Sequence, residues 1–303
     1  MNQRNARFDS ISNLFASSTI DECYGEAIGE AEGLKDESGE WSIKGHPDRI
    51  IHYDYKKLTI LAKLTSESAP MEARLLALQT KQMLDTIACF LDCRVLSQIV
   101  SGLSIMWDET YAQDDGILKR SSAGEALFPN SSRDMIYSGP HIAVANPVAK
   151  TPRKVCKEKG DYDCLDLTCL PIDYLQRSNY QVALSYAEYI AQMPRIVGQP
   201  VSMSYRLVSR KMLNLKQERT FNVSVVPPQT GHISGLVSVV FENIEELAVC
   251  AGAWASIPVD YYVKVLGKAN FNNAVADNLP VLAKGSNERI VLRGLMLNCL
   301  TSF

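Results

Sequence analysis

Two β-branched segments on either side of a double proline constrain the fold of this chain more than any other feature. The first, residues 221–226 (FNVSVV), alternates apolar and polar side chains over most of its length and ends at Pro227-Pro228. The second, residues 232–241 (HISGLVSVVF), follows after a short turn. A period of two is typical of a β-strand, and proline stops a strand because it has no amide hydrogen to donate. We therefore predict a β-hairpin or two neighbouring strands.

A cluster of basic residues precedes these strands in a chain whose net charge is −3. Residues 195–219 hold six bases against one acid, whereas residues 1–40 hold three bases against nine acids. A local patch, more than the total charge, indicates where a polyanion could bind. The alternative is a solvated basic face beside an acidic neighbour.

The sequence also bears on compartment and metal binding. It opens without the apolar core of a signal peptide, and no apolar run reaches the length of about 20 residues that spans a bilayer. We expect a cytoplasmic protein that does not enter a membrane, with its eight cysteines reduced. Cys156, Cys164 and Cys169 lie close together without a C-x-x-C spacing, which favours small apolar side chains over a zinc site. We predict no metal ligands.

The pattern of apolar residues changes between about residues 101 and 125. Before this region, residues 55–64 carry leucines at helical spacing, and a second helical stripe runs from Pro70 to about residue 100. After it come short strand-like runs and polar loops, and a helix that closes at Gly267. We predict an α+β chain with an acidic helical N-terminal extension at 1–40, an α-rich linker or helical domain at 41–115, and a mixed α/β domain at 116–303.

Three polar loops of the last domain carry side chains that donate to phosphate oxygens or reach base edges. For two of these residues a structural role is the alternative: His141 follows a proline at a strand edge, and Arg219 has Glu218 beside it as a partner inside the fold. The predicted DNA contacts are His141, Asn146, Lys150, Thr151, Arg153 and Lys154 in the first loop, Arg206, Arg210, Lys211 and Arg219 in the second, and Lys264, Lys268 and Asn270 in the third.

Five segments in one order carry a resemblance to a known family. They are GHPDRII at 45–51, WDETYAQDDGILKR at 107–120, SGPHIAVANPVAKTPR at 138–153, ERTFNVSVVPPQTGHI at 218–233, and VDYYVKVLGKANFN with LPVL and LRGLMLNCLT at 259–301. Together they resemble the C-terminal half of adenine-specific DNA methyltransferases of type IIG restriction-modification and phage-defence systems. The resemblance implies that the α+β domain is a target-recognition domain, which binds double-stranded DNA and selects the sequence to be methylated.

The chain departs from this family where catalysis is concerned. It has no glycine-rich turn for S-adenosylmethionine and no Asn-Pro-Pro-aromatic loop for a flipped adenine, since Asn146-Pro147 is followed by Val148. It has no G-x-S-x-G, Walker A or H-E-x-x-H motif either. We therefore predict no catalytic residues and no cofactor in this chain, and expect S-adenosylmethionine on a separate catalytic domain or subunit. The chain would be a fragment or one part of a split enzyme. The alternative is a structural subunit that docks onto a methyltransferase or another defence protein without touching DNA.

Overall fold

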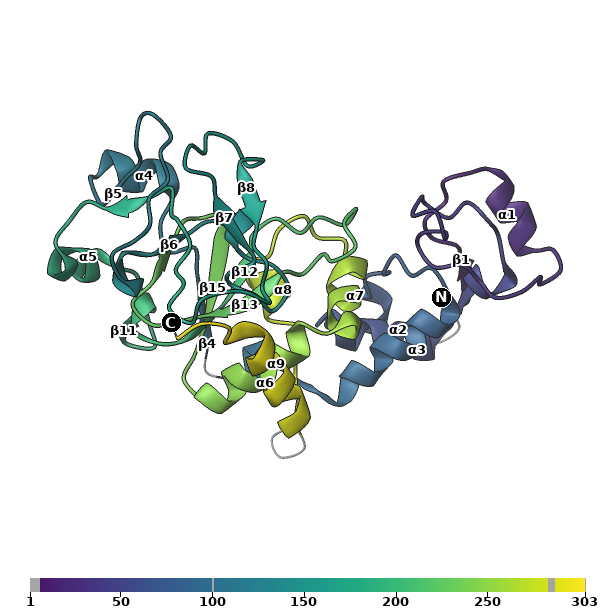
Figure 1. The fold of residues 1–303 in the computed structure, drawn as a ribbon. Helices are drawn as coiled ribbons and strands as arrows, with labels where there is room; N and C mark the ends of the chain where they lie inside the picture. The colour runs from purple at the N-terminus through teal and green to yellow at the C-terminus, as the bar shows by residue number, and fades with distance from the viewer. Residues whose placement is uncertain (1–5, 100, 283–286, 303) are drawn as a thin grey trace. The chain divides into compact units, whose positions relative to one another are not determined.

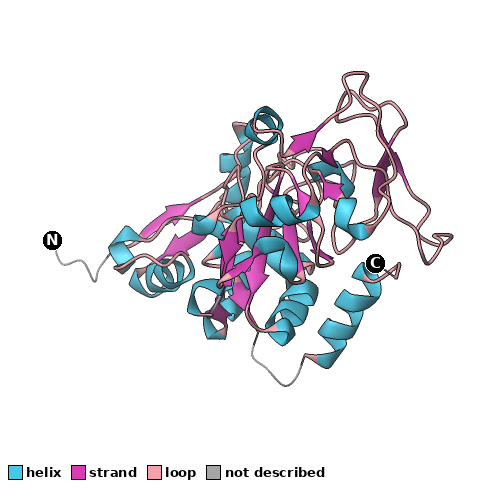
Figure 2. Ribbon diagram, turned by 90° about the vertical axis from the view of Figure 1, so that its left-hand side faces the viewer, coloured by secondary structure: helices cyan, strands magenta, loops and turns pink. Residues whose placement is uncertain are grey.

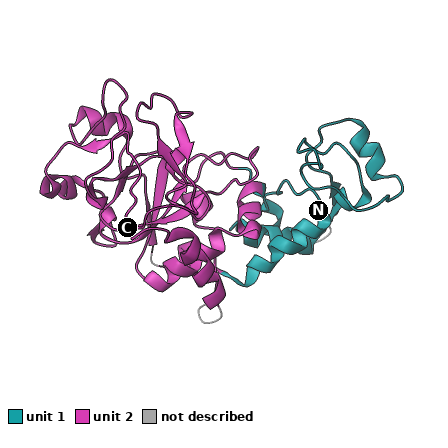
Figure 3. Cartoon of the chain, viewed as in Figure 1, with its two compact units in different colours: residues 1–93, 265–267 teal, residues 94–264, 268–303 magenta. Residues whose placement is uncertain are grey.

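The computed structural model describes residues 6–99, 101–282 and 287–302, and the chain divides into two compact units. Unit 1 comprises residues 1–93 and 265–267, and unit 2 comprises residues 94–264 and 268–303 (Figure 3). The division falls after Cys93, earlier in the chain than the change of pattern near residues 101–125. The reason is that β3 (Arg94–Val95) pairs with β16 (Pro280–Val281) of unit 2, and β4 (Ser101–Ser104) belongs to the main sheet of that unit.

In its described residues, unit 1 contains three short α-helices and a two-stranded ribbon. β1 (Phe8–Ser10) pairs antiparallel with β2 (Ile51–Tyr53), and α2 (Tyr55–Leu64) follows at once, with the Asp54 carboxylate accepting from the Lys57 amide as its N-cap. The helix predicted at 55–64 is therefore confirmed. The stripe predicted from Pro70 onward folds instead as η3 (Pro70–Glu72), α3 (Lys81–Ala88) and η4 (Cys89–Asp92). Among the described residues up to 40, the predicted helical extension contains a single helix, α1 (Ser18–Cys23).

Unit 2 is organised by a four-stranded antiparallel sheet in the order β13-β12-β15-β4. The two predicted strands are present as β13 (Val223–Val226) and β15 (Leu236–Phe241), but they do not pair with each other. β12 (Arg206–Arg210) lies between them and bonds to both, with Leu207 opposite Val225 on one side and Val239 on the other. The prediction of a hairpin or of neighbouring strands was wrong, because the segment taken for a basic loop supplies the central strand.

Both faces of this sheet are buried. On one face α6 (Ile244–Trp254) places Trp254 against Phe221 and Phe241, with ring centroids 6.0 and 5.9 Å apart, and α9 (Glu288–Asn298) packs on α6 (Figure 1; Figure 2). Gly252 of α6 and Gly294 of α9 lie where the two helices approach most closely. α7 (Ile257–Val265) ends before Gly267, whose φ of +65° fits the predicted helix stop.

Short strand pairs and loops cover the other face and the margins of the sheet, and one pair contacts α6. They contribute a second apolar cluster that includes Trp107, Tyr180 and Tyr189. The pairs are β6 (Ile136–Tyr137) with β14 (Gly231–His232), β5 (Leu118–Lys119) with β9 (Gln181–Val182), β7 (Lys150–Pro152) with β8 (Tyr162–Cys164), β10 (Arg195–Ile196) with β11 (Gln199–Pro200), and β3 (Arg94–Val95) with β16 (Pro280–Val281). The remaining elements are α4 (Glu109–Asp114), α5 (Tyr186–Gln192), α8 (Asn273–Ala276), η2 (Pro47–Arg49), η5 (Leu96–Gln98), η6 (Ser132–Asp134), η7 (Gly139–His141) and η8 (Val201–Met203).

The fold is α+β, as predicted: 32% of residues are helical and 20% lie in strands, the latter mostly in small antiparallel sheets. In the described ranges, no helix combines the length and the apolar character needed to cross a bilayer.

Candidate nucleic-acid interface

His141 is a structural residue, contrary to its prediction as a DNA contact. Its side chain is fully buried at the end of η7. Nε2 lies 2.9 Å from the Arg177 carbonyl and so must donate to it, while Nδ1 accepts from the Ser138 amide at 2.9 Å. Burial lowers the pKa of His141 to about 4, so the ring is neutral at neutral pH. The alternative of structural hydrogen bonding is the one that the structure supports.

Arg206 is likewise inside the protein. Its guanidinium donates to the carbonyls of Val201 at 3.1 Å and Thr230 at 2.8 Å and to the Thr230 hydroxyl at 2.8 Å. Burial lowers its pKa to about 10, and the residue remains a cation held by carbonyl dipoles. The predicted DNA contact is wrong: Arg206 ties the turn after β13 to the start of β12. No sequence signal marked this, since a charged residue at a strand start normally faces solvent.

Two other predicted contacts are buried and serve the backbone. The Asn146 side chain accepts from the Val148 amide at 2.8 Å, and Thr151 Oγ1 accepts from the Arg177 amide at 3.1 Å. These hydrogen bonds fix the loop that leads into and along β7. Because both residues are less than a tenth exposed, they are not available to a duplex in this conformation.

Lys264 and Arg219, two more of the predicted DNA contacts, instead make hydrogen bonds and an ion pair within the protein. Lys264 Nζ donates to the carbonyls of Gln217 and Glu218, both at 3.0 Å. Arg219 donates to the Ala255 carbonyl at 2.6 Å and pairs with Asp260 at 3.6 Å. Arg219 therefore has an acidic partner inside the fold, as the alternative proposed, but that partner is Asp260 and not Glu218. Lys264 and Arg219 hold the loop at 211–219 against α7.

Backbone hydrogen bonds bring the second and third loops together. The Leu213 amide donates to the Ala269 carbonyl at 2.9 Å, and the Phe271 amide donates to the Lys211 carbonyl at 2.7 Å. We call the surface of these two loops the crossed-loop surface; it carries Lys211, Lys216, Lys268 and Asn270. Among the residues that the structure describes, the three lysines of this surface make no ion pair. Lys216 is exposed, and Lys211 and Lys268 are half-buried.

The first loop forms a hairpin of β7 and β8, which projects near the top of Figure 1. Lys150 is half-buried and Lys154 is exposed, while Arg153 pairs with Asp163 at 2.9 Å and Asp161 at 4.0 Å. The Asp163 carboxylate raises the pKa of Arg153. Arg153 is thus partly neutralised, and Lys150 and Lys154 carry the accessible charge.

Arg210 connects the hairpin with the crossed-loop surface. It is half-buried at the end of β12, and its Nε donates to the Gly139 carbonyl at 3.1 Å in η7, which lies beside β7. Burial lowers its pKa. The structure therefore joins two of the three predicted loops directly and links the third through Arg210.

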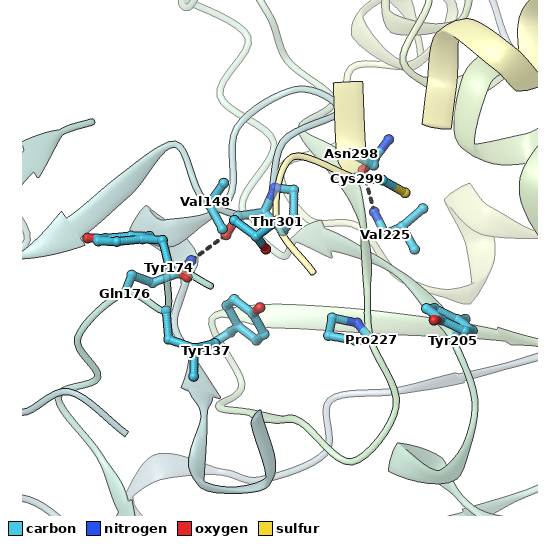
Figure 4. A pocket seen from close by; sticks show the side chains of 12 residues that line it. Tyr137, Val148, Tyr174, Gln176, Tyr205, Val225, Pro227, Asn298, Cys299 and Thr301 are labelled. Carbon is cyan, nitrogen blue, oxygen red and sulfur yellow. Dashed lines mark hydrogen bonds between the residues drawn. The ribbon is translucent and has the colours of Figure 1, made fainter. Parts of the chain in front are cut away.

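An open pocket lies on a different part of unit 2 (Figure 4). Tyr137, Tyr205 and Pro227 form part of its wall, and its space of about 40 Å³ is enough for about one water molecule. The buried Gln176 amide donates to the Pro147 carbonyl at 2.5 Å, and within the described ranges its Oε1 has no hydrogen-bond partner. The wall contains no carboxylate and no histidine, so the pocket lacks an acid–base pair.

Cysteines and other possible metal ligands do not gather in the described part of the chain: it holds no group of three or more His, Cys, Asp or Glu side chains placed to bind one ion. Cys156 is buried, as expected for a small apolar side chain, whereas Cys164 and Cys169 are exposed.

Comparisons with known proteins leave the family open. Neither the scan of protein-family models nor the search of curated proteins gives a match.

Proposed function

We propose that this chain is a DNA-binding, non-catalytic module, the target-recognition portion of an adenine-specific DNA methyltransferase system. The observation that supports the proposal best is the crossed-loop surface. Two lysine-bearing loops that are about 50 residues apart in sequence are joined there by backbone hydrogen bonds, so Lys211 and Lys268 lie next to the points where the loops join, and Lys216 lies in the turn that follows.

The chemistry of lysine fits phosphate contacts. An ammonium is a point charge on a flexible stem, which suits clamping a phosphodiester backbone more than reading a base edge. Asn270, an exposed amide on the same surface, can donate and accept, as base reading requires. On the resemblance to methyltransferases, we take duplex DNA as the polyanion that binds this surface. S-adenosylmethionine would bind to a catalytic domain or subunit outside this chain. Such a protein would work in the cytoplasm.

Binding to duplex DNA at several salt concentrations tests the proposal. Each phosphate contact releases counterions and adds about 0.9 to the slope of log affinity against log salt. The triple variant Lys211→Gln, Lys216→Gln, Lys268→Gln should bind more weakly and lose up to ~3 from that slope. The control carries Lys56→Gln and Lys63→Gln, two exposed lysines on α2 of unit 1, and should match the wild type.

Salt-independent binding, or equal slopes for the two variants, would refute the proposal.

The alternative of a docking subunit is supported by a different feature: the side chains of Leu292, Met296 and Leu297 on α9 are 60, 66 and 54% exposed. Exposed apolar residues on one helix are a feature of protein interfaces. Replacing Leu292 and Met296 by serine would leave DNA binding unchanged under the first proposal.

A further inference from the structure

A second pocket of unit 2 lies between β9 and the segment at 127–130. Leu127 and Ser178 exchange backbone hydrogen bonds at 3.1 and 2.8 Å, and β5 pairs with β9, so the walls are held by backbone contacts. The pocket measures about 210 Å³. At ~30 Å³ per water molecule this is the space of roughly seven waters, below the range of about 300–1,000 Å³ for drug-sized ligands. One ring system with a substituent matches this size.

The aromatic part of the wall is Phe128, which is 53% exposed. The Arg177 guanidinium lies 4.4 Å from its ring centroid. Arg177 is itself fixed to β7, because its amide donates to Thr151 Oγ1 at 3.1 Å. An exposed aromatic ring backed by a guanidinium is a stacking platform for a planar group.

Polar side chains surround this platform. Lys119, Asn130 and Gln181 line the pocket, and within the described part of the chain their side chains make no hydrogen bond or ion pair. The two amides can donate and accept along the edge of a base, and the lysine can contact a phosphate. Asp134, the acid in the wall, accepts from the Ser131 hydroxyl at 3.0 Å and is left with acceptor capacity for an exocyclic amine.

The pocket is continuous with the β7–β8 hairpin. The Ala126 amide donates to the Lys154 carbonyl at 2.9 Å, so the strand-like segment that ends in Phe128 runs along the basic hairpin. A nucleic-acid strand that contacts Lys154 would reach the pocket within a few nucleotides.

We propose that this pocket receives one unstacked base of a nucleic acid, with Phe128 as the stacking surface, Asn130 and Gln181 at the base edge, and Lys119 at the phosphate. The inference rests on the proposed DNA-binding function and adds to it a site for an unpaired nucleotide. In a duplex both faces of a base are stacked on its neighbours and its edge is paired, so this pocket favours single-stranded or distorted DNA.

The test uses the full chain and two fluorescent probes, a single-stranded 12-mer of mixed sequence and the matching duplex. Phe128→Ala should weaken single-strand binding by roughly 5- to 100-fold, the range expected for losing one base–aromatic stack. Its duplex affinity and salt slope should stay close to the wild type. Phe128→Trp should restore single-strand binding. Tyr111→Ala removes a 71% exposed ring on α4 outside the pocket and is the matched control.

Asn130→Ala provides a second variant, because Asn130 is exposed and its side chain makes no hydrogen bond in the described part of the chain. It should weaken single-strand binding and leave duplex affinity close to the wild type. Equal single-strand affinities for Phe128→Ala and Tyr111→Ala would overturn the pocket inference while leaving duplex binding, and the proposed function, intact. A wild type that binds neither probe would overturn both.

Discussion

The close approach of α6 and α9 gives a sharp test of the fold. A Cβ placed on Gly252 would lie 2.3 Å from the Ile290 carbonyl oxygen and 2.6 Å from Ile290 Cγ2. The first of these atoms belongs to the backbone and cannot rotate away. Gly252→Ala must therefore push the helices apart, whereas at an unhindered helical site the same change stabilises by about 1 kcal/mol.

Overpacking of a buried contact costs about 1–3 kcal/mol, and occasionally more. Because the clash here is with backbone, we expect the upper part of that range, and a net loss of about 2 kcal/mol after the gain in helix propensity. For a unit of this size that loss lowers the melting temperature by roughly 4–8 °C. The separation also pulls α6 off the sheet, where Trp254 contacts Phe221 and Phe241.

Thermal unfolding followed by tryptophan fluorescence and circular dichroism measures this loss. Hydrogen exchange at the amides of α6 and α9 assigns it to unit 2 in a chain with two units. Gly160→Ala is the control, because Gly160 has open space around its Cα and no left-handed backbone. A Gly252→Ala protein as stable as the wild type would refute the packing of α6 on α9 described above.

Two further predictions concern buried polar groups. Burial lowers the pKa of His141 to about 4 and that of His232 to about 3, below the ordinary value of 6.5. As the pH falls below 6.5, the two histidines are therefore protonated in the unfolded chain before they are protonated in the folded chain. The free energy of unfolding decreases as a result. We expect a loss of about 2 kcal/mol per histidine between pH 6.5 and 5, measured by urea unfolding; stability that is level over this window would contradict it. Asp260 Oδ1 accepts from the amides of Thr220 at 2.9 Å and Phe221 at 2.6 Å. Asp260→Ala leaves both donors unpaired and should cost about 3 kcal/mol, whereas Asp260→Asn keeps an acceptor and should cost less; equal losses for the two variants would show that these hydrogen bonds are not the cause.

Local signals in the sequence were sufficient for the elements that they specify. Leucine spacing identified α2, alternation identified β13, a β-branched run after a turn identified β15, and Gly267 marked the end of α7. Strand order was not accessible in the same way, because β12 carries an arginine at each end and reads as a loop.

The candidate site shows the same limit. The distribution of charge along the sequence located a basic region, but it did not show which of its cations are buried and bonded inside the protein. Arg206 donates to the backbone carbonyls of Val201 and Thr230, and Arg219 pairs with Asp260 and donates to a helix-end carbonyl. These partners depend on tertiary contacts, which the spacing of residues within one loop does not encode.

The division between arginine and lysine has a consequence for recognition. The planar guanidinium satisfies several carbonyls at once, so the fold places arginines such as Arg49 and Arg206 inside, while lysines, with one mobile charge, remain on the crossed-loop surface. A bidentate arginine on guanine is the commonest specific contact in the major groove, and lysines without it mostly hold phosphates. Under the proposed function, sequence preference at the crossed-loop surface would come from exposed amides such as Asn270, and from the deformability of the DNA. Affinity set by lysines should vary little between duplexes of different sequence at a given salt concentration, and strongly with salt.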